Sequence, residues 1–95
     1  MAKRLMIQQS VTRKLVYPLI SDQVLIGRLD CLDLVIDSPE VSRVHAKMLF
    51  QAPRWILYDL ESKGGTEVNG EPVASHDLSD GDIISIGSTR LEYRE

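Results

Sequence analysis

The densest chemistry in this sequence lies in the stretch Val41-Ser42-Arg43-Val44-His45-Ala46, which holds a hydroxyl, a guanidinium and an imidazole. A serine and a histidine this close could act as a nucleophile and its base. In an extended chain, however, residues three apart point to opposite faces, so Ser42 and His45 should not meet as such a pair requires. Neither a G-x-S-x-G motif nor a pair of carboxylates placed for acid/base work accompanies them. We therefore expect that the protein is not an enzyme.

The same residue types can also bind an oxyanion. Three loops carry a basic residue beside glycine or hydroxyl side chains, namely Gly27-Arg28, Ser42-Arg43 and Ser62-Lys63-Gly64-Gly65-Thr66. A phosphate group favours arginine for paired hydrogen bonds, a hydroxyl donor, and free backbone N–H groups that glycine lets come close. If the three loops lie at one end of the fold, they form a small basic pocket. The alternative is that these side chains are ordinary solvated surface.

The elements that position these loops are expected to be short strands. Apolar or alternating segments recur at roughly ten-residue spacing with turn residues between them, and no segment combines a helical period with caps. The segments expected to form strands are 5–7, 14–20, 23–27, 34–36, 43–50, 54–60, 66–68, 71–73, 82–87 and 89–93. The pattern predicts an all-β sandwich or barrel.

Several details of these strands can be checked. The alternation over 43–50 is expected to direct Val44 and Phe50 into the core, where Trp55 should join them. A polar break is expected at Ser10-Val11-Thr12. Pro18 cannot donate to a ladder and is expected at a sheet edge or a strand end.

Composition limits the possible functions. The chain has 95 residues, which is one domain's worth, and we expect residues 1–95 to form a single, most simply monomeric, domain. The net charge of −3 argues against nucleic acid as a partner. One cysteine and two histidines predict no internal disulfide, no metal site and a reducing, cytoplasmic location. No apolar run is long enough to span a membrane, and no signal peptide is expected.

Five blocks in fixed order resemble the forkhead-associated (FHA) domain family: Gly27-Arg28, Ser42 to Ala46, Ser62 to Thr66, Val68-Asn69-Gly70 and Gly81-Asp82. The resemblance extends from about Val24 to Glu95. It implies a β-sandwich of about eleven short, mostly antiparallel strands whose loops at one end bind phosphothreonine peptides. The implied function is a phosphopeptide-binding module, without a cofactor, that recognises phosphothreonine on partner proteins in Ser/Thr-kinase signalling.

The resemblance also implies roles for individual residues. Arg28 corresponds to the arginine that pairs with the phosphate, and Ser42 to the hydroxyl that donates to it. The full set expected to bind the phosphopeptide is Arg28, Ser42, Arg43, Lys63, Gly64 and Thr66. The residues expected to support the binding loops are Gly27, which permits the turn before Arg28, His45, which ties the loops together, and Asn69, within the hairpin turn Asn69-Gly70.

One position departs from the family's pattern. The usual Ser-x-Asn-Gly-Thr reads Ser62-Lys63-Gly64-Gly65-Thr66 here, and Gly64 has no side chain to replace the asparagine that clamps the bound peptide. Two lost hydrogen bonds at ~0.5–1.5 kcal/mol each weaken binding by roughly 1–3 kcal/mol, on the order of five- to a hundredfold. The alternative hypothesis is therefore a phospho-independent protein–protein interaction domain that keeps the fold but has a weakened peptide site.

Overall fold

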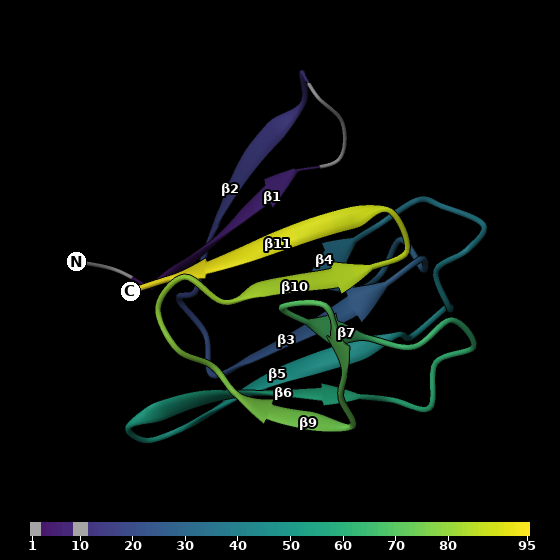
Figure 1. Ribbon diagram of the computed structural model, residues 1–95. Helices are drawn as coiled ribbons and strands as arrows, with labels where there is room; N and C mark the ends of the chain where they lie inside the picture. Colours follow the sequence, from purple (N-terminus) through teal and green to yellow (C-terminus); the bar gives the residue numbers. More distant parts are fainter. Residues whose placement is uncertain (1–2, 9–11) are drawn as a thin grey trace.

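The computed structural model describes residues 3–8 and 12–95 and shows a two-layer β-sandwich (Figure 1). The described residues contain no helix, and hence none long and apolar enough to cross a membrane. Their eleven strands are β1 (Arg4–Gln8), β2 (Lys14–Pro18), β3 (Gln23–Gly27), β4 (Leu34–Val35), β5 (Ala46–Gln51), β6 (Arg54–Asp59), β7 (Glu67–Val68), β8 (Glu71–Pro72), β9 (Ser75–Asp77), β10 (Ile83–Ile86) and β11 (Thr89–Arg94). The predicted all-β class is confirmed. Ser10 and Val11 of the expected polar break lie outside the described residues.

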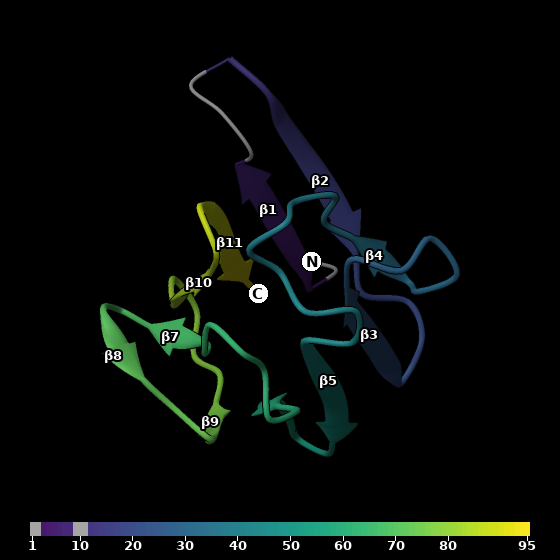
Figure 2. The same cartoon turned by 90° about the vertical axis from the view of Figure 1, so that its right-hand side faces the viewer.

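The strands form two sheets. The first has six strands in the order β2-β1-β11-β10-β7-β8, and the second has five in the order β4-β3-β5-β6-β9. The recorded pairings are antiparallel except for β3 with β4, which is parallel. The predicted mostly antiparallel sandwich is therefore confirmed, and the ribbon views show its two layers (Figures 1 and 2).

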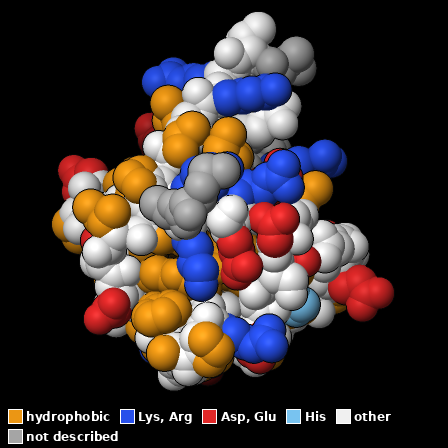
Figure 3. All heavy atoms as spheres, turned by 90° about the vertical axis from the view of Figure 1, so that its left-hand side faces the viewer, with side chains coloured by type: hydrophobic (Ala, Val, Ile, Leu, Met, Phe, Trp, Pro, Cys, Tyr) orange, Lys and Arg blue, Asp and Glu red, His pale blue; other side chains and the backbone are white. Residues whose placement is uncertain are grey.

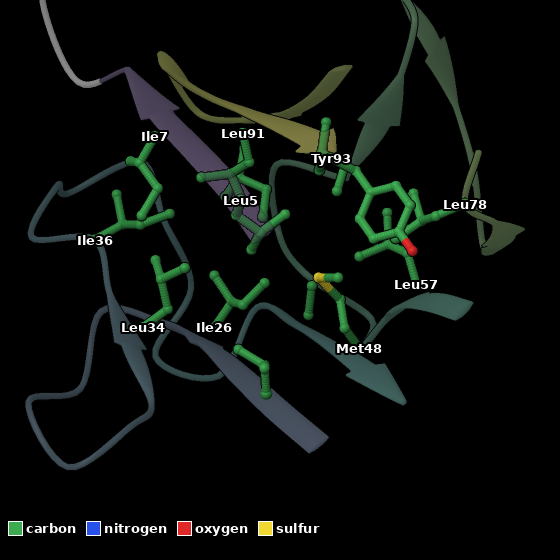
Figure 4. Packing of buried hydrophobic residues seen from close by; sticks show 14 of the residues in the cluster. Leu5, Ile7, Ile26, Leu34, Ile36, Met48, Leu57, Leu78, Leu91 and Tyr93 are labelled. Atoms are coloured by element: carbon green, nitrogen blue, oxygen red, sulfur yellow. The ribbon is translucent and has the colours of Figure 1, made fainter. Parts of the chain in front are cut away.

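The core lies between the two sheets because β1, β3, β5, β6, β10 and β11 alternate buried side chains with more exposed ones. On β1 the buried positions are Leu5 and Ile7, and on β11 they are Leu91 and Tyr93. Figure 4 shows these side chains packed against others from the second sheet. The buried apolar residues that complete the core are Val24, Ile26, Leu34, Ile36, Val41, Ala46, Met48, Trp55, Leu57, Val68, Leu78, Ile84 and Ile86.

Two local predictions are confirmed. β2 is an edge strand, and Pro18 is its last residue, so the missing N–H of this proline removes no bond from the sheet interior. Asn69 and Gly70 join β7 to β8 with φ angles of 53° and 86°. Positive φ at both central residues is the geometry that two-residue hairpins prefer.

The strand predicted over 43–50 begins only at Ala46, so its predicted facing is wrong at the first positions. Val44 is 37% exposed, whereas His45 is fully buried. The cause is a set of backbone bonds: the N–H groups of Arg28 and Leu29 donate to the carbonyl of Arg43. These bonds fold the segment before Ala46 against the end of β3, and the alternation of an extended strand does not apply there.

Phe50 was predicted in the core but is 37% exposed. It pairs with Trp55 across β5 and β6, with the ring centroids 5.6 Å apart, and Trp55 is buried as predicted. Phe50 lies at the end of the sandwich opposite Gly27, where the second sheet runs out. Figure 3 looks onto this end, where apolar side chains reach the surface.

The remaining differences concern the limits of strands. β2 ends at Pro18 and not at Ile20, although Leu19 still donates its N–H to the carbonyl of Lys3. The polar segment Ser75–Asp77 was not predicted as a strand, yet it forms β9 at the edge of the second sheet by pairing with β6. This segment has no alternation of apolar and polar side chains, so the sequence pattern did not predict a strand there.

Candidate functional site: a basic pocket at one end of the sandwich

Three loops that are far apart in sequence line one cavity. They are the segment after β3, the connection between β4 and β5, and the connection between β6 and β7, and Figure 2 looks onto the end where they lie. The cavity has a volume of about 700 Å³. Its lining residues are Arg28, Pro39, Glu40, Val41, Ser42, Arg43, Val44, Lys63 and Gly64. The structure thus brings together five of the six residues predicted to bind phosphopeptide.

Gly27 allows the first two loops to touch. A Cβ atom built on this buried residue would lie 2.3 Å from the carbonyl oxygen of Arg43, which no ordinary contact permits. The next backbone N–H, that of Arg28, is shared between the carbonyls of Ser42 and Arg43, at 3.1 Å from each. Gly27 is therefore required for close backbone approach, and its φ does not lie in the left-handed region.

Arg28 is held at its Nε atom. This atom donates to the carbonyl of Val41 at 3.0 Å, so the guanidinium is anchored on the neighbouring loop. Within residues 3–8 and 12–95 its two terminal amino groups make no further hydrogen bond or ion pair, and the side chain is exposed. An arginine fixed at Nε with its terminal amino groups unpaired can donate to two oxygens of one anion.

Ser42 joins the second loop to the third. Its hydroxyl oxygen accepts the backbone N–H of Lys63 at 2.9 Å. The hydroxyl hydrogen is not used in that bond, so it can be donated to a ligand in the cavity. The hydroxyl therefore both braces the wall formed by Lys63 and offers a donor beside Arg28.

His45 is completely buried and connects the same loops from below. Its Nδ1 accepts the backbone N–H of Ser42 at 3.1 Å, so the ring hydrogen lies on Nε2, which donates to the carbonyl of Gly65 at 2.8 Å. Both ring nitrogens are thus occupied by backbone groups. The extended geometry expected for this segment is wrong, and the ring of His45 does contact Ser42. The contact nevertheless involves the serine backbone, and no Ser–His pair of side chains forms.

The charges around the cavity favour an anion. Arg28, Arg43 and Lys63 contribute three cations, and one carboxylate, that of Glu40, lies among them. Glu40 is turned toward a neighbouring loop: its Oε1 accepts the hydroxyl of Ser88 at 2.7 Å and the N–H of Ser88 at 3.2 Å. The hydrogen bond from the Ser88 hydroxyl is the main cause that lowers the pKa of Glu40. These donors stabilise the charged carboxylate, so Glu40 remains an anion that the three cations around the cavity outnumber.

Comparison with known proteins decides the family. The sequence profile described as the FHA domain matches residues 24–87. This chain belongs to the FHA domain family. No group of three or more His, Cys, Asp or Glu side chains that could hold a metal ion occurs in the part of this FHA domain that the structure describes.

Two regulators are among the similar proteins. The glycogen accumulation regulator GarA of Mycolicibacterium smegmatis is 39% identical over 67 residues, which are 70% of this chain and 42% of GarA. The transcriptional regulatory protein EmbR of Mycobacterium tuberculosis is 41% identical over 71 residues, 74% of this chain and 18% of EmbR. The chain therefore spans less than half the length of either relative.

Solved structures agree with this assignment. Mycobacterium tuberculosis EmbR, in complex with a low-affinity phosphopeptide, has a TM-score of 0.90 and 31% identity, covering 98% of this chain and 24% of EmbR. An FHA domain solved in a study of phosphothreonine-dependent interactions has a TM-score of 0.88 and 29% identity, covering 100% of this chain and 97% of its own.

Thr66 does not line the cavity of this FHA domain. It is 1% exposed, and its hydroxyl donates to Oδ1 of Asp59 at 2.7 Å. Asp59, which the sequence analysis did not single out, also accepts the hydroxyl of Ser62 on Oδ1 and its N–H on Oδ2. Burial alone would raise the pKa of Asp59, but the hydrogen bonds from Ser62 and Thr66 lower it. The carboxylate therefore shapes the third loop from inside. An aspartate at a strand end with a serine three residues later is a signal that could have predicted this.

Asn69 lies away from the binding loops. Its Nδ2 donates to Oδ1 of Asp82 at 3.0 Å, and its Oδ1 accepts the N–H of Ile83 at 3.0 Å. Asn69 thereby attaches the β7–β8 hairpin to the start of β10. Its support for the pocket is indirect, through the strand β7 that follows the third loop.

Gly64 forms part of the cavity wall where the family usually has asparagine. A Cβ atom at this position would lie 3.4 Å from the carbonyl oxygen of Glu40, which is close to an ordinary contact, and its φ is not left-handed. The backbone can therefore accept a side chain. The absent asparagine is a difference in sequence and does not reflect a distorted loop.

Proposed function

We propose that this FHA domain binds phosphothreonine on a partner protein, with the phosphate between Arg28 and Ser42. The observation that carries the proposal is the convergence of these two residues on one cavity, each anchored by a backbone contact and each with an unused donor. The phosphopeptide bound to EmbR supports the same site, since 98% of the present chain superimposes on part of that structure.

The chemistry follows from the charges. A phosphorylated threonine carries about −1.5 to −2 charges at pH 7 and presents acceptor oxygens only. The terminal amino groups of Arg28 donate charge-assisted hydrogen bonds to two oxygens, and the Ser42 hydroxyl donates to a third. Arg43 and Lys63, on two different loops that line the cavity, add attraction that weakens as salt is raised.

The domain has fewer groups that can bind the peptide backbone than groups that can bind the phosphate. Gly64 offers no side-chain amide, so the clamp that the family's asparagine provides is missing. The phosphate therefore contributes a larger share of the binding free energy here. We accordingly expect modest affinity and a strong dependence on phosphorylation.

The test is a titration of phosphothreonine, phosphoserine and unphosphorylated peptide libraries against the wild type and variants. Arg28→Ala removes the paired donors and should cost about 2–4 kcal/mol, roughly 30- to 1,000-fold in affinity. Ser42→Ala should cost about tenfold. Arg54→Ala, an exposed arginine at the start of β6, is the matched control and should bind like wild type. Equal binding by Arg28→Ala and wild type would contradict the proposal.

A further inference from the structure

A second surface of this domain, away from the phosphate cavity, is the outer edge of β2. The three highest exposures recorded for large apolar side chains are those of Leu15 (47%), Val16 (58%) and Ile20 (88%), and all three lie on β2 or directly after it. Figures 1 and 2 show β2 as the outermost strand, rising with β1 above the rest of the molecule. An exposed apolar edge strand is a site where another strand can pair.

The pairing with β1 shows which backbone groups are open. Leu19 donates its N–H to the carbonyl of Lys3, and the antiparallel register continues from there, with Tyr17 opposite Leu5. Hydrogen-bonded and non-bonded pairs alternate along the two strands. The backbone N–H and C=O groups of residues 15, 17 and 19 therefore point toward β1, whereas those of residues 14, 16 and 18 point away from it, to the open edge. Pro18 has no N–H, so the open edge offers two N–H donors, on Lys14 and Val16.

This arrangement is complementary to itself. If two copies of β2 pair antiparallel with Val16 opposite Val16 of the second copy, then Lys14 faces Pro18 of that copy. The N–H of Val16 donates to the carbonyl of the opposite Val16, and the N–H of Lys14 donates to the carbonyl of the opposite Pro18. Two donors from each copy give four hydrogen bonds in all. Every open N–H is used, and the only donor missing from the paired edge is that of Pro18.

The side chains fit the same register. The side chain of Leu15 lies on the core-facing side of the sheet, opposite Ile7, but is exposed. In the paired register it lies opposite Tyr17 of the second copy. Val16 meets its own copy on the outer side. The two Lys14 residues lie four positions apart along the paired strands, about 14 Å, which exceeds the screening length of about 8 Å at physiological salt. No like charges face each other, and two apolar side chains from each copy are covered.

We propose that the domain self-associates through β2, forming a two-fold dimer with one continuous sheet across both copies. Five-residue strands bury far less than the roughly 800 Å² per partner of standard interfaces, and lysine on the edge weakens pairing further, so the dimer is weak and depends on concentration. This departs from the expected monomer. None of the residues that line the cavity lies on β2, so both cavities stay open and the dimer can bind a doubly phosphorylated partner with avidity.

The first test is sedimentation of the full chain over a range of concentrations. Wild type should show a monomer–dimer equilibrium, and Val16→Lys, which places like charges at the two-fold axis on an exposed position, should raise the dimer Kd by about tenfold or more. Val35→Lys, an exposed valine on the edge strand β4 of the other sheet, is the control and should dimerise like wild type. A protein that stays monomeric near millimolar concentration, or a dimer insensitive to Val16→Lys, overturns the proposal.

The second test fixes the register. Facing residues of a hydrogen-bonded antiparallel pair have Cα atoms about 5.5 Å apart, within disulfide range. In a Cys31→Ser background, which removes the exposed native cysteine, Val16→Cys should oxidise to a linked dimer. Lys14→Cys, two residues away and equally on the open edge, faces Pro18 of the second copy and should not. The reverse result, or linkage of both variants at equal rates, rules out this pairing.

Discussion

The hydroxyl of Ser42 accepts the backbone N–H of Lys63 at 2.9 Å, and this bond joins two walls of the cavity that are 21 residues apart in sequence. The buried ring of His45 joins the same two loops by hydrogen bonds to the backbone of Ser42 and the backbone of Gly65. The pocket is therefore held by contacts to backbone groups. Its shape is fixed before a ligand arrives, so little of the binding free energy is spent on ordering the loops.

His45 should be needed for both stability and binding. His45→Ala leaves the N–H of Ser42 and the carbonyl of Gly65 without partners in a buried position and opens a cavity. We expect a loss of about 2–5 kcal/mol in the free energy of unfolding, measured by urea denaturation. His76→Ala, at a half-buried histidine outside the pocket, is the control for binding. A folded His45→Ala variant with wild-type peptide affinity would contradict the bridging role.

Gly27 should not tolerate even one methyl group. In Gly27→Ala the new Cβ meets the carbonyl of Arg43, so the first two loops must separate, at a cost of about 1–3 kcal/mol in stability. Phosphopeptide affinity should fall by about tenfold or more, because Arg28 and Ser42 move apart. Gly64→Ala meets only an ordinary contact and should unfold like wild type. Similar unfolding midpoints for both variants would show that the close approach at Gly27 is unimportant.

Gly64→Asn should strengthen binding. The backbone accepts a side chain at this position, and an amide there restores the clamp on the peptide main chain. We expect an increase in affinity of roughly five- to a hundredfold for phosphothreonine peptides, measured by calorimetry. Gly64→Ala, which adds bulk without an amide, should leave affinity unchanged. If Gly64→Asn brings no gain, a phospho-independent role of the domain becomes the better explanation.

Asp59 should make stability depend on pH in the acid range. Hydrogen bonds from Ser62 and Thr66 hold its pKa below the ordinary value of 3.8 despite burial. A carboxylate with a lowered pKa stabilises the fold fully above its unfolded pKa, and this contribution is lost as pH falls through the folded pKa. Urea midpoints should therefore drop below about pH 4.

The Asp59→Asn variant isolates this contribution. It should be less stable than wild type at pH 7 by about 1–2 kcal/mol and show a shallower decline between pH 5 and pH 2. Asp77→Asn, on the exposed strand β9, controls for the removal of one negative charge. Asp59→Asn and wild type with equal slopes would show that this carboxylate does not link folding to pH.

Much of the fold and most of the pocket could be predicted from the sequence. Short apolar segments and turn residues locate most strands because their signals are local. That the loops around Arg28, Ser42 and Lys63 meet is implied by the resemblance to the FHA family. The burial of His45 could not be predicted, because it depends on backbone bonds between Arg43 and the end of β3, which are far apart in sequence. The same holds for Thr66, which turns inward to Asp59 and away from the ligand.

A crystal of the domain soaked with a phosphothreonine peptide would show whether phosphate binds between Arg28 and Ser42. We expect the phosphorus atom in the cavity, with phosphate oxygens within about 2.7–3.0 Å of a terminal nitrogen of Arg28 and of the Ser42 hydroxyl. A phosphate bound elsewhere on the domain, or an empty cavity at a peptide concentration that saturates binding in solution, would contradict it.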